Sequence, residues 1–216
     1  SHSLCGVMTT SHPSVSMKRI GYQIALVCLG IGLASEAQAA WIWTPQTRRW
    51  VNPKYAAKDT PQAQMDWAVN FFEAGDYARA AKEWSRLVRS YPRSELAPEA
   101  QYLAGLCFEL MGRSGAAFNA YKQVVEIYPF SGRFKDAIER EFLIAEELYA
   151  GKRLPLIGPI QVPALDKAIE IYQHVVDRAP YGDYAARAQL KLGECAIRQR
   201  RVEEANRAFQ QVVEEY

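Results

Sequence analysis

Few residues in this chain have the types and spacing that chemistry at a protein site requires. Beyond residue 39 the sequence contains one histidine, His174, and two cysteines, Cys107 and Cys195. A metal site or an activated nucleophile needs several such groups brought together. Ser114 and Ser131 have no plausible His–Asp partners in the sequence. We therefore predict no catalytic residues, no cofactor-binding residues and no metal ligands, so the chain is not expected to be an enzyme.

Clustered carboxylates could act as a general acid and base, but they more often form the solvated face of a helix. One predicted helix carries four of them, Glu139, Glu141, Glu146 and Glu147. We expect these four side chains to be solvated. His174 follows helical spacing beside the apolar Val175 and Val176, so we expect a partly buried structural residue and not a base or a ligand.

Similar apolar runs recur along the chain, and each is followed by a proline. Pro92, Pro129 and Pro180 lie 37 and 51 residues apart, and a fourth run, QQVVEEY, stops at Tyr216. The repeating unit is therefore about 37 residues, and the third copy has about 14 additional residues. A fixed period of this length indicates stacked supersecondary units, none of which can bury its apolar face alone.

Small and large residues alternate within each unit as they do in tetratricopeptide repeats. Gly105 and Gly193 occupy the small position of a first helix. The second helices carry an alanine followed four residues later by an aromatic residue: Ala80 and Trp84, Ala117 and Tyr121, Ala168 and Tyr172, Ala205 and Phe209. The sequence therefore predicts an all-α fold, a tetratricopeptide-repeat helical-hairpin solenoid of about four repeats over residues 62–216. Cys107 and Cys195 share one repeat position, so we expect two packing thiols and no disulfide.

The helices implied by this register begin at polar or glycine turns and end before the prolines, which cannot extend the hydrogen-bond ladder of a helix. We predict helices over 62–74, 77–90, 98–111, 114–127, 134–150, 164–178, 183–199 and 202–215.

Two segments interrupt this pattern. Residues 152–163, KRLPLIGPIQVP, contain three prolines and form an insert within repeat three. The insert is either a loop folded onto the flank of the repeats or a docking segment for a partner. Residues 40–61 form a Trp-rich N-terminal segment, in which β-branched and aromatic residues flank a Thr-Pro-Gln-Thr turn and favour a short hairpin.

Residues 1–39 read as an upstream extension and a cleavable signal peptide. Met17-Lys-Arg is a basic start, residues 24–34 are apolar, and Ala37-Gln-Ala provides a small-x-small cleavage pattern. Cys28 lies within the apolar run, so we find no lipobox and expect export to the periplasm. The formal net charge of +2 is too small to indicate nucleic-acid binding.

The linker between the first two units supports a family resemblance. Residues 91–105, YPRSELAPEAQYLAG, are similar to the linker of exported bacterial repeat proteins, and the chain most resembles the BamD (YfiO) family of outer-membrane β-barrel assembly factors. The interrupted third unit is similar to that family as well. The resemblance covers roughly residues 62–216 and implies a periplasmic scaffold, possible peripheral association with the outer membrane through partners, and protein partners: the assembly machinery or unfolded β-barrel substrates.

Two other functions remain open. The CpoB (YbgF) proteins, periplasmic adaptors of the Tol–Pal envelope and cell-division system, share the Tyr-Pro style of linker. An envelope enzyme is the alternative from a different class, and an assay for hydrolase activity on cell-wall or peptide substrates tests it.

In tetratricopeptide arrays the first helices line a groove at unit positions two, five, nine and twelve. Here these positions give a candidate peptide-binding groove in the first half of the array: Met65, Val69, Phe72, Tyr102, Leu106 and Glu109. Unit four contributes Arg187, Leu190, Glu194 and Ile197. An exposed apolar patch of this kind marks either a binding site or an intramolecular contact. A partner peptide or the segment from Trp41 to Trp50 is expected to cover it.

Overall fold

The structure is a computed structural model that describes residues 42–44, 49–51, 56–157 and 160–216. The described residues form eight α-helices: α2 (Pro61–Glu73), α3 (Tyr77–Ser90), α4 (Ala97–Leu110), α5 (Ser114–Ile127), α6 (Phe134–Tyr149), α7 (Leu165–Arg178), α8 (Ala185–Arg198) and α9 (Val202–Glu215). Every predicted helix is present, and the bounds differ from the prediction by at most two residues at either end.

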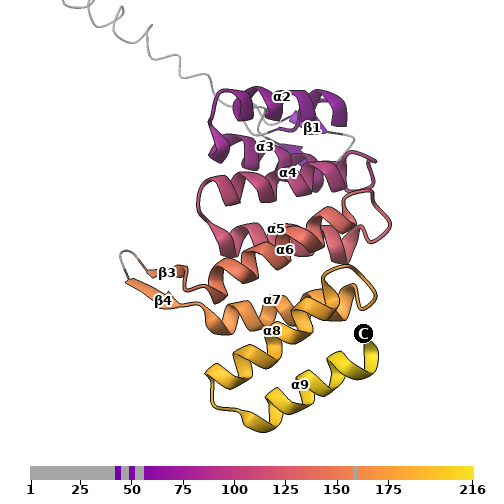
Figure 1. Ribbon diagram of the computed structural model, residues 1–216. Coiled ribbons are helices and arrows are strands. Elements are labelled where there is room, and N and C mark those ends of the chain that lie inside the picture. The colour runs from indigo at the N-terminus through magenta and orange to yellow at the C-terminus, as the bar shows by residue number, and fades with distance from the viewer. Residues whose placement is uncertain (1–41, 45–48, 52–55, 158–159) are drawn as a thin grey trace, which may run out of the picture. The chain divides into compact units, whose positions relative to one another are not determined.

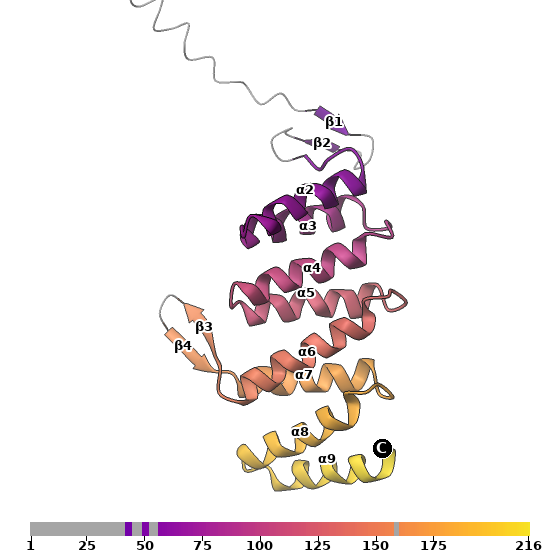
Figure 2. The ribbon, with the colours of Figure 1, turned by 45° about the horizontal axis from the view of Figure 1, so that its top comes forward.

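Over residues 56–216 the helices stack in chain order as four pairs, α2–α3, α4–α5, α6–α7 and α8–α9 (Figures 1 and 2). This arrangement confirms the predicted all-α repeat solenoid. Three of the pairs are joined by tight turns that contain one residue with a positive φ: Gly75 (76°), Gly112 (69°) and Arg200 (60°). Glycine adopts this left-handed conformation without a steric cost. An arginine pays a steric cost there, because its Cβ atom crowds the backbone.

Local sequence explains where the first two helices begin. The hydroxyl oxygen of Thr60 accepts a hydrogen bond from the Ala63 amide, and Pro61 follows at the first helical position. The carboxylate of Asp76 caps α3 in the same way, by accepting from the Arg79 amide at 3.1 Å. These caps satisfy amides that have no partner inside the helix.

The contact between helices of a pair follows the predicted small-against-large scheme. A Cβ atom at Gly105 of α4 would come within 2.6 Å of the Tyr121 ring of α5, and Gly193 faces the Phe209 ring in the same way. The third unit departs from this scheme, because Phe142 occupies the small position and lies beside Tyr172, with ring centroids 5.7 Å apart.

A buried glutamine links the two helices in three of the four pairs. In each case its Nε2 donates to a backbone carbonyl oxygen 19 residues further along, a link that the repeat pattern of the sequence does not predict. The donors are Gln64, Gln101 and Gln189, and the acceptors are Glu83, Ala120 and Ala208 respectively, at 3.1, 3.1 and 3.4 Å. Ile138 stands at this position in the third unit and cannot make the bond.

The buried apolar side chains form two clusters. One belongs to α2, α3 and α4, and the other belongs to α5, α6, α7 and α8. The half-buried Phe108 of α4 packs against both clusters and joins them.

The insert of the third unit is a β-hairpin. Strand β3 (Arg153–Ile157) pairs antiparallel with β4 (Ile160–Pro163), and Arg153 lies opposite Pro163. The hairpin projects from the edge of the stack opposite the inter-repeat loops and does not lie along its flank (Figures 1 and 2). The extended path was predicted, but the pairing of the strands was not.

The predicted N-terminal hairpin is also present. Strands β1 (Ile42–Thr44) and β2 (Arg49–Val51) form a two-stranded sheet, and the rings of Trp43 and Trp50 meet edge-on at 6.1 Å. The turn between them, residues 45–48, lies outside the described residues, as does the expected signal peptide, residues 1–39. Within the described part of the chain no helix has the length and apolar character needed to cross a membrane.

Candidate interaction surfaces

The first-unit residues of the candidate groove are largely used in helix packing. Met65 is buried, and its sulfur accepts a hydrogen bond from the indole Nε1 of Trp84 at 3.1 Å. Phe72 is half-buried, with its ring centroid 5.6 Å from that of Trp84 and 5.4 Å from that of Tyr77. Val69 is half-buried beside them. The expectation that Met65 is exposed is therefore wrong, because the second helix of the unit reaches back over it.

The second-unit groove residues support a polar network. Tyr102 is half-buried between the ring of Tyr121, 5.3 Å away, and the guanidinium of Arg133, 4.7 Å away. Glu109 accepts from the Tyr121 hydroxyl at 2.6 Å and pairs with Arg140 at 2.7 Å. Burial, and then the Glu109 carboxylate, raise the pKa of Tyr121. Glu109 therefore holds helices together, and the half-buried Leu106 lies in the same row of groove positions.

Exposed apolar side chains occur at groove positions in the second half of the array. Leu143 of α6 is 40% exposed, and Leu190 and Ile197 of α8 are 43% and 57% exposed. Their unit positions are nine, five and twelve. The guanidinium of Arg187 lies over the ring of Phe142, with its Cζ 4.5 Å from the ring centroid. Each of these three side chains is more exposed than the apolar and aromatic residues of the predicted half, which are buried or half-buried.

The third unit contains a buried contact between the carboxyl group of Glu141 and the imidazole of His174. Glu141 is fully buried, and its Oε2 lies 2.7 Å from Nδ1 of the buried His174. Nε2 of His174 lies 3.7 Å from the Glu126 carboxylate, and Arg178 also contacts Glu126 at 3.0 Å. Burial raises the pKa of Glu141, and the hydrogen bond from His174 opposes that shift. His174 is structural, as predicted, but the solvated face predicted for Glu141 is wrong.

Glu146 is a second correction on the same helix. Its carboxylate accepts a hydrogen bond from the hydroxyl of the buried Tyr172, so it faces the second helix of its unit. Glu139 and Glu147 are exposed, as predicted.

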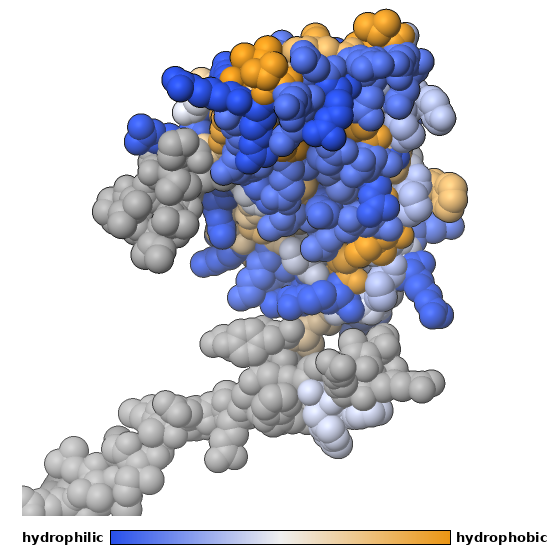
Figure 3. All heavy atoms as spheres, turned by 90° about the horizontal axis from the view of Figure 1, so that it is seen from below, coloured by the Kyte–Doolittle hydropathy of each residue, from blue (hydrophilic) through white to orange (hydrophobic). Residues whose placement is uncertain are grey.

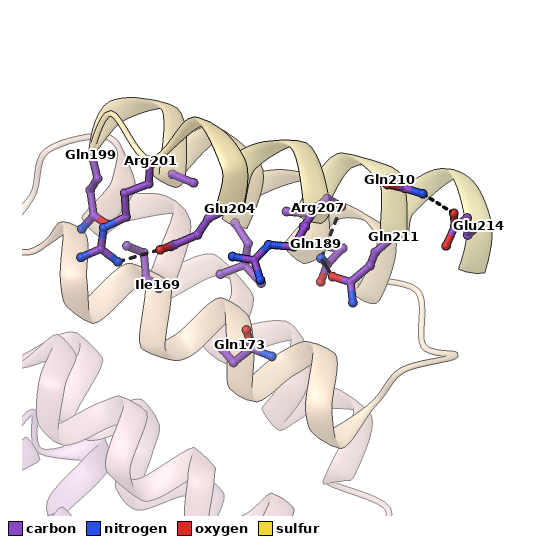
Figure 4. Close-up of a pocket in the computed structure, with 13 residues that line it drawn as sticks. Ile169, Gln173, Gln189, Gln199, Arg201, Glu204, Arg207, Gln210, Gln211 and Glu214 are labelled. Carbon is purple, nitrogen blue, oxygen red and sulfur yellow. Dashed lines mark hydrogen bonds and ion pairs between the residues drawn. The ribbon is translucent and has the colours of Figure 1, made fainter.

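A cavity of about 530 Å³ lies between α7, α8 and α9 (Figure 4). Its amide and guanidinium groups already have partners: Gln189 donates to Gln211 at 2.6 Å, Gln210 to Glu214 at 2.7 Å, and Arg201 pairs with Glu204 at 3.3 Å. A cavity of about 450 Å³ occupies the corresponding place between α3, α4 and α5. Because the cavity recurs with the repeat, it reflects the architecture of the array.

The described residues bring together no group of three or more side chains that could hold a metal ion. Cys107 and Cys195 are buried free thiols, which confirms the prediction of no disulfide between them. Burial raises the pKa of Cys107 to about 12 and that of Cys195 to about 11.

On the face shown in Figure 3 the surface is mainly hydrophilic, and its hydrophobic residues gather in separate patches.

The geometry defines a scaffold of stacked helix pairs, and two segments match known repeats. Residues 65–132 and residues 187–216 each match a tetratricopeptide repeat family. Together with the paired helices, these matches identify tetratricopeptide repeats in the chain. Domains built from such repeats generally bind other proteins. No curated protein matches the sequence.

Solved structures with a similar arrangement include MamA and a kinesin light chain. A crystal structure of MamA is 17% identical, with a TM-score of 0.42, over 73% of this chain and 78% of that chain. MamA from Desulfovibrio magneticus RS-1 is 20% identical, with a TM-score of 0.37, over 91% and 93%. A putative kinesin light chain of Podosopora anserina with nearly identical TPR-like repeats is 18% identical, with a TM-score of 0.37, over 70% and 72%.

Proposed function

We propose that this protein is an exported periplasmic scaffold that binds other proteins during assembly of outer-membrane β-barrel proteins. The observation that carries the binding role is the set of exposed apolar side chains at groove positions of α6 and α8. These side chains remain exposed after the helices have packed, so a partner peptide can contact them.

The location and the pathway rest on sequence features. The basic start, short apolar run and small-x-small pattern in residues 1–39 support export. The linker over residues 91–105 and the interrupted third unit support the likeness to the BamD family. The insert of that unit is the β3–β4 hairpin.

Affinity capture from envelope extracts with the full chain tests the proposal. We expect components of the β-barrel assembly machinery to be recovered. The variant Leu143→Ser with Leu190→Ser should lose that recovery and keep its helical content, because both side chains are exposed. Leu110→Ser, which removes an exposed leucine outside the groove positions, is the matched control.

Other outcomes separate the alternatives. Recovery of Tol–Pal components instead would support the CpoB-like adaptor. Recovery that the double variant does not change would contradict a role for α6 and α8. Mass spectrometry of the mature N-terminus checks export, which predicts a first residue at or near Ala40; an uncleaved chain or a lipid-modified Cys28 would contradict it.

A further inference from the structure

A small apolar pocket lies at the junction of the third and fourth units. It forms between the first turn of α6 and the loop that joins α7 to α8, with a volume of about 300 Å³. Its lining includes apolar and aromatic residues together with one lysine and one aspartate: Phe134, Ile138, Tyr181, Tyr184, Lys135 and Asp183.

One wall of the pocket results from a departure from the repeat. Ile138 stands where the other three units have the buried glutamine that bonds to a carbonyl of the second helix. Isoleucine offers only an apolar side chain at this place.

The preceding junction has a cavity at the corresponding place, although Gln101, the counterpart of Ile138, does not line it. Three of its lining residues are charged, and two of them, Arg133 and Glu99, pair with each other, with Nη2 and Oε1 2.8 Å apart. Tyr184 takes the place of Arg133 one unit later and instead lies against Phe142, with ring centroids 5.1 Å apart. Among the residues that the structure describes, no ion pair spans the later junction, and most of the residues that line its cavity are apolar or aromatic.

The charged residues of the pocket are available to a ligand. Lys135 and Asp183 are both exposed, and neither takes part in an ion pair within the part of the chain that the structure describes. Tyr181 is 96% exposed, so nearly all of its ring surface remains to be buried on binding. Aromatic residues that become buried in this way dominate the energetics of many interfaces.

We propose that this pocket binds a single bulky apolar side chain from an extended segment of a partner protein, with an acidic residue on one side of it and a basic residue on the other. The charges match Lys135 and Asp183, and the volume is at the low end for small-molecule sites, which suits one side chain and not a cofactor. The inference rests on the proposed function as a protein-binding scaffold and adds a site distinct from the groove positions of α6 and α8.

Synthetic peptides test the pocket directly. The probe is the capped peptide Gly-Glu-Gly-Phe-Gly-Lys-Gly, titrated into the full chain and followed by NMR. We expect saturable shifts of the Ile138 and Tyr184 amides. Replacing the phenylalanine of the peptide by alanine should weaken binding about tenfold or more, because the buried aromatic surface is lost. The variant Tyr181→Ala should weaken binding of the phenylalanine peptide as well and leave the circular dichroism spectrum unchanged.

Charge reversal tests the specificity. The unmodified chain should prefer the mixed-charge peptide over Gly-Glu-Gly-Phe-Gly-Glu-Gly by about threefold, as expected of exposed ion pairs. Asp183→Lys should invert that preference, and this readout does not depend on the direction in which the peptide lies.

Three results would overturn the proposal. They are no saturable shift of the pocket amides, equal affinity for the phenylalanine and alanine peptides, and an affinity for the phenylalanine peptide that Tyr181→Ala does not change. Phe130, in the loop between α5 and α6, is fully exposed like Tyr181. Co-sedimentation with phosphatidylethanolamine–phosphatidylglycerol vesicles that is lost in Tyr181→Ala with Phe130→Ala, in the absence of peptide binding, would assign these exposed aromatic residues to a lipid surface instead. The capture experiment with the Leu143 and Leu190 variant is independent of this pocket, so failure of the peptide leaves the proposed function standing.

Discussion

Gly105 of α4 lies directly against the ring of Tyr121 of α5, so closely that a Cβ atom on the glycine would come within 2.6 Å of Cε1. We expect Gly105→Ala to lower the free energy of unfolding by about 1–3 kcal/mol, because the ring or the helix must shift to admit the methyl group. Urea unfolding followed by circular dichroism measures this change.

The matched control is Gly115→Ala on α5, where an added Cβ would meet nothing within 4 Å. This change should be neutral or stabilising by up to about 1 kcal/mol, since alanine is the better helix former. Equal effects of the two substitutions would mean that the contact between α4 and α5 is not close at Gly105.

Arg200 has a φ of 60° at a turn where the corresponding residues of the first two units are Gly75 and Gly112. We expect Arg200→Gly to raise the free energy of unfolding by about 1 kcal/mol, because glycine removes the steric cost of the left-handed conformation. The reverse comparison, Gly112→Ala, should lower it by a similar amount. Thermal and urea unfolding of both variants check the prediction, which fails if Arg200→Gly is destabilising.

The buried carboxyl group of Glu141 should make stability depend on pH. Burial raises its pKa in the folded state, so folded Glu141 binds its proton more tightly than the unfolded chain does. The stability it contributes is therefore fully present below the unfolded pKa, about 4.3, and is lost as pH rises through the folded pKa. Glu141→Gln removes this dependence, so the variant should gain stability relative to the unmodified chain as pH rises from 4 to about 7.

The control for this experiment is Glu147→Gln on the same helix. Glu147 is exposed and pairs with Lys152, so its substitution should change stability only slightly. A difference between Glu141→Gln and the unmodified chain that does not change with pH would contradict the raised pKa.

Both buried thiols should resist alkylation while the protein is folded. The thiolate is the reactive form, and burial raises the pKa of Cys107 to about 12 and that of Cys195 to about 11. We expect iodoacetamide at about pH 8 to modify neither residue in buffer and both in urea. Peptide mass spectrometry reports each site separately, and rapid labelling of Cys107 in the folded protein would show that it is accessible.

The sequence predicted the helices well because the signal is local and repeats. The small residue at Gly105, the aromatic residue at Tyr121 and the proline after each second helix fix the register within one unit. The failures involve partners that are distant in sequence. Glu141 looked solvated because nothing near it in the chain reveals His174, which lies 33 residues away.

The candidate groove was predicted incompletely for the same reason. Repeat positions indicate which side of a helix faces the groove, but they do not indicate how far a neighbouring side chain covers it. Met65 is buried because Trp84 bonds to its sulfur, whereas Leu190, at the same unit position in the fourth unit, stays exposed. The insert was recognised from its prolines, but the pairing of β3 with β4 depends on register, which the prolines obscured.

The division of the core into two clusters joined through Phe108 has a consequence for how the array comes apart. In a linear array each unit is stabilised only by its neighbours, so the weakest interface sets where cooperativity ends. Phe108 contacts both clusters, and its ring is therefore a coupling element between the block α2–α4 and the block α5–α8. The same boundary also holds the close contact of Gly105 with Tyr121 and the hydrogen bond from Gln101 to Ala120, so we expect the two blocks to unfold together and not one after the other.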